Sequence, residues 1–237
     1  MRVPTSDSEI PRVGLLLPST NTVMEPDLWG ALWQLATLHT FRIQLDDVTA
    51  EAESRMLSAA PGVAEQLRRL RPRISIFGCT SAGGLLGWAG EQQLTATLEA
   101  RSGSEVVSIL GAVNAVLRDD VGASTVAVFT PYVEALSAGI AGSLEACGFH
   151  VEQVSSLGLT DNAAIASLSP GQVRAAVSES LGGTTADAVF VSCTNLRSMS
   201  VADDLAEQLG RPVVTSNQAV ARVVRQRLTE QLELMEA

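Results

Sequence analysis

Two cysteines follow apolar stretches that are typical of buried strands, and a threonine follows each of them. Cys79 comes after residues 74–78, and Cys193 comes after residues 188–192. A thiolate and a thiol on opposite faces of one carbon atom can remove a proton from one side and return a proton to the other, as general base and general acid. The sequence therefore predicts two-sided proton chemistry that needs no metal and no coenzyme.

The position of each cysteine just after a strand bears on its reactivity. A helix usually begins at the carboxyl end of a parallel strand, and its free N–H groups and positive dipole end lower the pKa of a nearby thiol. We therefore expect a thiolate near neutral pH. The alternative is a structural role, because free cysteine is among the most often buried residue types. The repeated Cys-Thr context favours the chemical role for Cys79 and Cys193, whereas Cys147, at a predicted helix end, is interpreted as structural.

Strand-like and helix-like patterns alternate along the whole chain, and their order repeats. Each half contains a strand, a polar turn, a helix, a strand, a helix, a strand with Cys-Thr, a helix, a strand and a helix; the first half opens with a strand at 12–17 and a helix predicted at 23–38. Such alternation predicts parallel sheets with helices on both faces. The predicted fold class is therefore α/β, with two pseudo-symmetric three-layer α/β/α domains and the active site in the cleft between them.

A polar break with a glycine at residues 119–123 marks the predicted domain boundary. The first domain is predicted to comprise residues 1–118 together with the terminal helix at 216–237, and it carries Cys79. The second is predicted to comprise residues 119–215, and it carries Cys193.

Composition argues against several classes of protein. The 237 residues include 16 Lys and Arg against 26 Asp and Glu, a formal net charge of −10, whereas nucleic-acid binding requires clustered cations. The three cysteines lie far apart, without the spacing of a disulfide framework or of metal ligands. No apolar run reaches the length of a membrane span. We expect a cytoplasmic protein with reduced thiols and with no metal, nucleic-acid or membrane partner.

Five short motifs follow one another along nearly the whole chain. They are Pro18-Ser-Thr-Asn-Thr22, Gly78-Cys-Thr-Ser81, Thr130-Pro-Tyr132, Asp161-Asn162 and Ser192-Cys-Thr-Asn195. With these motifs the sequence resembles the aspartate/glutamate racemase superfamily, and within it the branch of maleate cis-trans isomerase and arylmalonate decarboxylase. The stretches at 14–27 and 215–219 are most similar to racemase-like proteins encoded with ectoine-utilisation genes.

The resemblance implies a cofactor-independent enzyme that acts on a small carboxylate, with Cys79 and Cys193 as its catalytic thiols. The candidate substrate-binding residues are Asn21, Thr80, Ser81, Tyr132, Asn162 and Thr194. Hydroxyl and amide donors of this kind can hold the enediolate-like charge that forms when a proton is removed next to a carboxylate. The arylmalonate decarboxylases carry only one of the two cysteines, so the presence of both favours a racemase or isomerase.

Several functions stay open at this point. The first expectation is racemisation or isomerisation of a small amino-acid-type or dicarboxylate substrate, and cis-trans isomerisation of maleate by thiol addition is one form of it. A decarboxylase of substituted malonates, with one thiol as proton donor, is a second. A two-lobed protein that binds a ligand without catalysis is a third, and association into a homo-oligomer is possible in each case.

Overall fold

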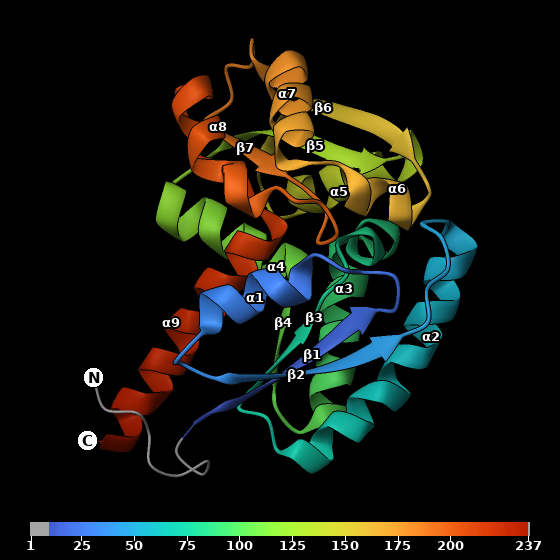
Figure 1. Cartoon of the computed structure of the whole chain (residues 1–237), viewed down its shortest axis with the longest axis vertical. Helices are drawn as coiled ribbons and strands as arrows, with labels where there is room; N and C mark the ends of the chain where they lie inside the picture. The colour runs from blue at the N-terminus through green and yellow to red at the C-terminus, as the bar shows by residue number, and fades with distance from the viewer. Residues whose placement is uncertain (1–9, 237) are drawn as a thin grey trace.

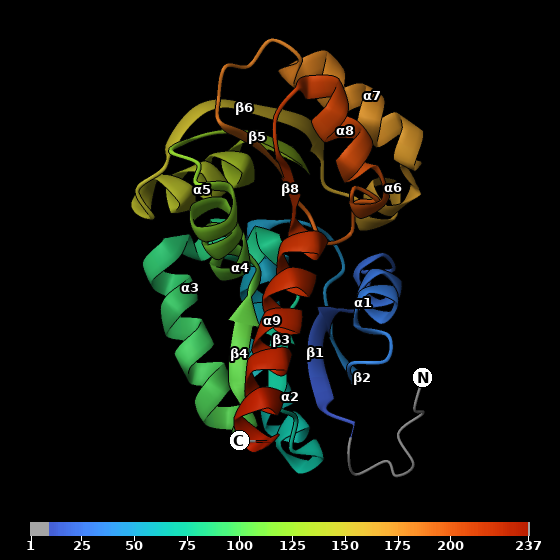
Figure 2. The same ribbon diagram turned by 90° about the vertical axis from the view of Figure 1, so that its left-hand side faces the viewer.

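The computed structural model describes residues 10–236 and shows two lobes, each built around a four-stranded sheet in which all strands run parallel (Figures 1 and 2). The strand order is β2-β1-β3-β4 in one sheet and β6-β5-β7-β8 in the other. The elements of the first part of the chain are β1 (Arg12–Pro18), α1 (Met24–Leu32), β2 (Thr37–Ile43), α2 (Ala50–Leu67), η1 (Arg68–Leu70), β3 (Ile74–Phe77), α3 (Thr80–Ser102), β4 (Glu105–Ser108), α4 (Ile109–Ala115) and η2 (Val116–Val121). Those of the remainder are β5 (Thr125–Tyr132), α5 (Glu134–Ala146), β6 (His150–Leu159), α6 (Asn162–Ser167), α7 (Pro170–Leu181), β7 (Ala188–Val191), η3 (Met199–Val201), α8 (Ala202–Leu209), β8 (Val213–Thr215) and α9 (Ser216–Glu236). The two sheets thus repeat one topology, as the sequence predicts, and the predicted α/β class is confirmed.

The central strands are apolar on both faces because helices cover both sides of each sheet. In β1, Leu15 and Leu17 belong to one buried cluster and Leu16 to another. Successive side chains of a strand point to opposite faces, so the alternation divides the core of the first lobe into two layers. The cluster that contains Leu16 also contains residues of α2 and α3, whereas the other cluster continues into the second lobe.

The strand order places a ligand-binding position in each sheet. In the first sheet β2 lies on one side of β1, whereas β3 and then β4 lie on the other side. Loops that follow β1 and β3 therefore diverge at the carboxyl edge of the sheet, and open parallel sheets bind ligands in the crevice at such a point. The equivalent crevice in the second sheet lies after β5 and β7.

The last helix joins the two lobes. α9 begins directly after β8 of the second sheet and packs against α1 and α4. Figure 2 shows it running along the first lobe past β4 and β1. The domain boundaries at 118/119 and 215/216 stay predictions.

One predicted helix is shorter than expected. The pattern at 23–38 was expected to be helical throughout, but α1 ends at Leu32 and β2 begins at Thr37. Gln34 has φ 70°, a left-handed conformation that breaks the helix, and Thr37 pairs with Arg12 of β1. The last residues of the predicted helix therefore belong to β2, where they pair with β1.

A contact between glycines brings α3 of the first lobe against α5 of the second. A Cβ atom on Gly139 would lie 2.1 Å from the carbonyl oxygen of Gly84, and one on Gly84 would lie 2.8 Å from Cγ1 of Ile140. Both positions need glycine because the backbones approach this closely. Since α3 begins directly after Cys79, the same contact holds the start of α3 close to the second lobe.

Replacement of Gly139 by alanine tests this contact. We expect Gly139→Ala to lower the free energy of unfolding by about 1–3 kcal/mol, because the added methyl group forces the helices apart. Gly142→Ala is the matched control, since Gly142 is exposed in the same helix with open space around it, and it should be neutral or stabilising by up to about 1 kcal/mol. Urea unfolding followed by circular dichroism measures both. Equal stability of the two variants would contradict the proposed close contact.

Candidate active site

The two cysteines lie at the ends of equivalent strands, but their local structures differ. Cys79 follows β3 in an extended conformation and is the N-cap of α3. Cys193 follows β7 with φ 105°, and the next helical residues after it begin only at Met199. The backbone N–H of Asn195 donates to the sulfur of Cys193 over 3.3 Å. The expectation of a helix N-terminus therefore holds for Cys79 and is wrong for Cys193.

A narrow cavity of about 10 Å³ lies between the lobes and is lined from both of them. Its lining residues are Pro18, Asn21, Leu45, Cys79, Thr80, Ser81, Tyr132, Asn162, Cys193, Thr194 and Asn195. All the site residues predicted from the sequence are among them. The two thiols are almost fully buried, with 5% of Cys79 and 2% of Cys193 exposed. The hydroxyl and amide groups of the lining suit the oxygens of a carboxylate.

Cys79 lies against a buried carboxyl group that the sequence analysis did not single out. Its sulfur is 3.5 Å from Oε2 of Glu53 and 3.4 Å from the hydroxyl oxygen of Ser81. Ser81 in turn donates its hydroxyl proton to Glu53. Burial, and then the charge of Glu53, raise the pKa of the Cys79 thiol well above its ordinary value, although the N–H of Ala82 in α3 acts in the opposite direction. The expectation of a lowered thiol pKa is therefore wrong, because desolvation outweighs the helix terminus.

Cys193 has a hydroxyl partner and no carboxyl partner among the described residues. Burial raises its pKa to about 11, while a hydrogen bond from the Tyr132 hydroxyl lowers it. Burial and the neighbouring Cys193 also raise the pKa of Tyr132 well above its ordinary value, so this hydroxyl keeps its proton. Tyr132 is thus a donor toward the sulfur of Cys193.

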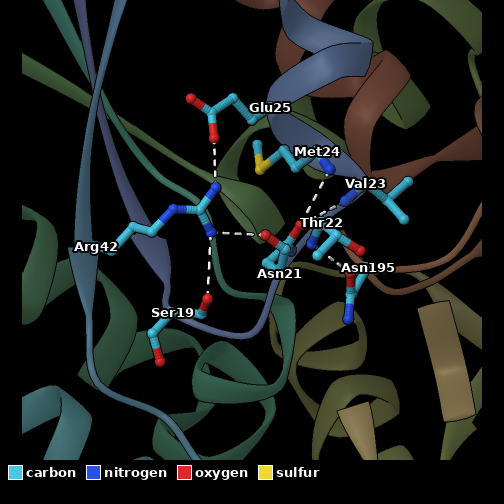
Figure 3. A network of polar contacts seen from close by, with 8 residues as sticks. All are labelled: Ser19, Asn21, Thr22, Val23, Met24, Glu25, Arg42 and Asn195. Atoms are coloured by element: carbon cyan, nitrogen blue, oxygen red, sulfur yellow. Dashed lines mark hydrogen bonds and ion pairs between the residues drawn. The ribbon is translucent and has the colours of Figure 1, made fainter. Parts of the chain in front are cut away.

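Asn21 is held from several sides in the loop after β1 (Figure 3). Its Oδ1 accepts the N–H groups of Val23 and Met24 at 3.1 and 3.0 Å, and its Nδ2 donates to the hydroxyl of Thr194 over 2.9 Å. Arg42 of β2 donates to the carbonyl of Asn21 over 2.8 Å.

The same Arg42 forms an ion pair with Glu25 of α1 and donates to the carbonyl of Ser19 over 3.3 Å (Figure 3). It therefore joins β2, the loop after β1 and the start of α1. This role was not predicted from the sequence, because an arginine in a strand carries no signal of the loop that it contacts.

Hydrogen bonds across the cleft hold the two halves of the site together. The hydroxyl of Thr194 donates to the carbonyl of Gly78 over 3.2 Å, and Oδ1 of Asn195 accepts the N–H of Thr22 over 2.9 Å. Ser216, the first residue of α9, lies 3.2 Å from the hydroxyl of Thr80 and accepts the N–H of Cys193 over 3.1 Å. Ser216 thus contacts Cys193 itself and Thr80, the residue that follows Cys79.

Asn162 offers an amide donor at the cavity. Its backbone carbonyl accepts from Nδ2 of Asn195 over 3.0 Å, but its own Nδ2 is buried and has no hydrogen-bond partner among the described residues. Buried polar groups are normally paired, so an unpaired donor in the lining of a cavity marks a place for a ligand acceptor. A carboxylate oxygen is such an acceptor.

Other reactive groups lie outside this cavity. Cys147 is the C-cap of α5, and burial raises its pKa to about 11, which agrees with the structural role expected for it. Within residues 10–236 no cluster of three or more His, Cys, Asp or Glu side chains is arranged to hold a metal ion. The groups that line the cavity are the thiols, hydroxyls and amides described above, and Glu53 lies behind Cys79.

Comparisons with known proteins bear on this arrangement. The family model described as arylmalonate decarboxylase matches residues 13–233. The maleate isomerase of Nocardia farcinica is 26% identical over 223 residues, which cover 90% of this chain and 88% of that protein.

Solved structures share the fold. The N. farcinica maleate cis-trans isomerase bound to TRIS superimposes with a TM-score of 0.87 at 24% identity, and the match covers 93% of each chain. A cysteine-to-serine mutant of that enzyme, solved with a covalently bound succinylcysteine intermediate, gives a TM-score of 0.85 at 24% identity with the same coverage. The superfamily branch predicted from the motifs is confirmed, whereas the closer likeness to ectoine-utilisation proteins stays a prediction.

Removal of the Tyr132 hydroxyl tests its contact with Cys193. In Tyr132→Phe we expect the pKa of Cys193 to rise above its value of about 11, because the hydrogen bond that stabilises the thiolate is lost. The ¹³Cβ chemical shifts of labelled cysteine, followed from pH 6 to 12 in a Cys147→Ser background, report each thiol separately. An unchanged Cys193 titration would contradict the contact.

Proposed function

This chain belongs to the arylmalonate decarboxylase family, and on that premise we propose that it is a cofactor-independent racemase or isomerase of a small carboxylate. The observation that carries the proposal is the convergence of Cys79 and Cys193, from opposite lobes, on one cavity lined by neutral hydrogen-bond donors. Such a pair can act on the two faces of a bound carbon atom as base and acid, or as nucleophile and acid.

The donors around the cavity fit the charge that the reaction develops. Proton removal next to a carboxylate moves an electron pair onto its oxygens, and fixed donors lower the barrier when they point at that charge. We assign this role to the free amide of Asn162, to the N–H groups at the start of α3, and to the side chains of Asn21 and Thr80, whereas Thr194 orients Asn21 by accepting a hydrogen bond from its amide. Tyr132 assists by holding the sulfur of Cys193.

Retention of both thiols separates this proposal from decarboxylation. Loss of carbon dioxide from a malonate leaves an enediolate that needs a proton on one face only, so one thiol suffices. The second cysteine, buried in the same cavity, has a use when the carbon is attacked from one face and protonated from the other.

Cis-trans isomerisation of maleate is a second candidate, and the relatives favour it. In that reaction a thiolate adds to the double bond, the resulting single bond rotates, and the thiolate leaves again. A succinylcysteine intermediate is bound in the N. farcinica structure described above, which is the adduct that forms when a thiolate adds to the double bond and the neighbouring carbon takes a proton. Cys79 or Cys193 is the corresponding nucleophile in this chain under the proposal.

A cytoplasmic location is part of the proposal. All three cysteines are free thiols, and thiol chemistry persists in a reducing compartment. No helix among residues 10–236 is long and apolar enough to cross a membrane.

A proton NMR time course in deuterium oxide tests the reaction type, with aspartate, glutamate, N-acetyl-diaminobutyrate and maleate as separate substrates. Loss of an α-proton signal supports racemisation and names the substrate class. Conversion of maleate to fumarate supports isomerisation by addition. Silence on all four, together with carbon dioxide release from a substituted malonate, would overturn the proposal in favour of decarboxylation. Silence in both assays would favour ligand binding without turnover.

Single substitutions of the thiols test the two-sided mechanism. We expect Cys79→Ser and Cys193→Ser each to lower kcat by about 10²–10⁴-fold, the usual contribution of one acid or base, while circular dichroism shows the folded protein. Cys147→Ser is the matched control and should keep its activity, because Cys147 lies outside the cavity. Full activity in either of the first two variants would refute the two-thiol mechanism.

A further inference from the structure

Glu53 is a buried acid whose role the two-thiol mechanism leaves open. It lies in the first turns of α2, and 0% of it is exposed. Its hydrogen-bond partners are the thiol of Cys79 at 3.5 Å and the hydroxyl of Ser81. It is not among the cavity-lining residues, so it reaches the cavity through these two side chains.

No ion pair among residues 10–236 involves Glu53. A buried carboxylate without a cation is costly, and such groups are kept in proteins mainly where the charge is used. Burial raises the pKa of Glu53, while the hydrogen bonds from Ser81 and then Cys79 lower it. The titratable groups coupled to it are Cys79, Cys193 and Tyr132.

The two cysteines differ in what can take their protons. Cys79 has the Glu53 carboxylate within hydrogen-bond reach, whereas Cys193 is contacted by the Tyr132 hydroxyl and the N–H of Asn195, which are donors. Both thiols have raised pKa values because they are buried, so both carry protons near neutral pH. A base is nevertheless required on one face of the substrate, and Glu53 is the carboxylate next to a thiol.

We propose that Glu53 accepts the thiol proton of Cys79, so that Cys79 becomes the base or nucleophile of the reaction and Cys193 becomes the proton donor. The proposal rests on the proposed function and assigns the two thiols their separate roles. Glu53 acts through Cys79 and is therefore a positioning and proton-accepting partner of that residue.

The step balances without any further reactant. The S–H bond of Cys79 breaks as its proton moves to a carboxylate oxygen of Glu53. The freed electron pair on sulfur then takes the substrate α-proton, and the electrons of the C–H bond move into the substrate carboxylate. Cys193 gives its proton to the opposite face of the same carbon. This turnover leaves Glu53 protonated and Cys193 as a thiolate, and proton exchange with solvent water returns both to their starting states. In the reverse direction Cys193 takes the α-proton, Cys79 gives its proton to the carbon, and the proton of Glu53 returns to Cys79.

For an unsaturated diacid the same transfer produces a nucleophile. The Cys79 sulfur forms a bond to one carbon of the double bond, the π electron pair moves into the adjacent carboxylate, and Cys193 gives its proton to the neighbouring carbon. After rotation the Cys193 thiolate takes that proton back, the electron pair re-forms the double bond, the C–S bond breaks, and Glu53 gives its proton back to sulfur.

The variant Glu53→Gln keeps the size of the side chain and removes the base. We expect kcat at pH 7 to fall by about 100-fold or more. We also expect kcat to rise about tenfold per pH unit between pH 7 and 9, because the proton of Cys79 must now leave to solvent, whereas the wild type should be level over this range. A kcat at pH 7 within threefold of wild type, or a loss that is equal at every pH, would overturn the proposal.

Two further variants separate this role from a structural one. Glu53→Asp retains a carboxyl group and should keep the level pH profile even where its kcat is lower. Glu91→Gln is the matched control, because Glu91 is also buried with a raised pKa but caps α4 through the N–H of Leu110, and its pH profile should match wild type. A sloping profile in either variant would contradict the assignment.

A measurement without turnover keeps the test independent of the proposed function. In ¹³Cβ-labelled protein with Cys147→Ser, Glu53→Gln should lower the pKa of Cys79 by about one unit or more, because the neighbouring negative charge is lost. An unshifted Cys79 titration would overturn the pairing of Glu53 with Cys79. If the wild type shows no reaction in the NMR panel, the proposed function fails, and this titration alone decides whether Glu53 and Cys79 form a proton pair.

Discussion

Desolvation of two thiols between two lobes is the constraint on which the rest of this structure depends. A buried sulfur resists ionisation, so chemistry at this cavity requires a nearby proton acceptor and donors already in place. Two contacts hold the lobes together around the thiols. Helices α3 and α5 approach closely at Gly84 and Gly139, and Ser216 forms hydrogen bonds with Thr80 and Cys193. The raised thiol pKa values are thus a consequence of burying the site between the lobes.

The repeated topology explains why the site has two sides, and the departures from the repeat explain why its sides differ. Both sheets deliver a Cys-Thr pair after an equivalent strand. Cys79 begins a helix and contacts Glu53, whereas Cys193 adopts a left-handed conformation and contacts Tyr132. A symmetric scaffold therefore holds one thiol beside an acceptor and the other beside donors, which is the asymmetry that base and acid require.

Much of this was predictable from sequence because strand-end chemistry leaves short local signals. The Cys-Thr repeat pointed to Cys79 and Cys193, and the family resemblance carried by the short motifs supplied the other six candidate residues; all eight line one cavity. Glu53 and Arg42 were not predicted as site residues, because glutamates in a helix and an arginine in a strand are typical of an ordinary protein surface. Their partners, Cys79 and Asn21, lie 26 and 21 positions away in the sequence. The thiol pKa was mispredicted for the same reason, because burial by the second lobe is a property of the assembled fold.

The most direct test of the central claim is a crystal structure of the Cys193→Ser variant with the substrate that the NMR panel identifies. The account predicts that the sulfur of Cys79 lies on one face of the reacting carbon and the side chain at position 193 on the other, each at about van der Waals contact of 3.5–4.0 Å. Both side chains on the same face, or a substrate bound outside this cavity, would contradict it.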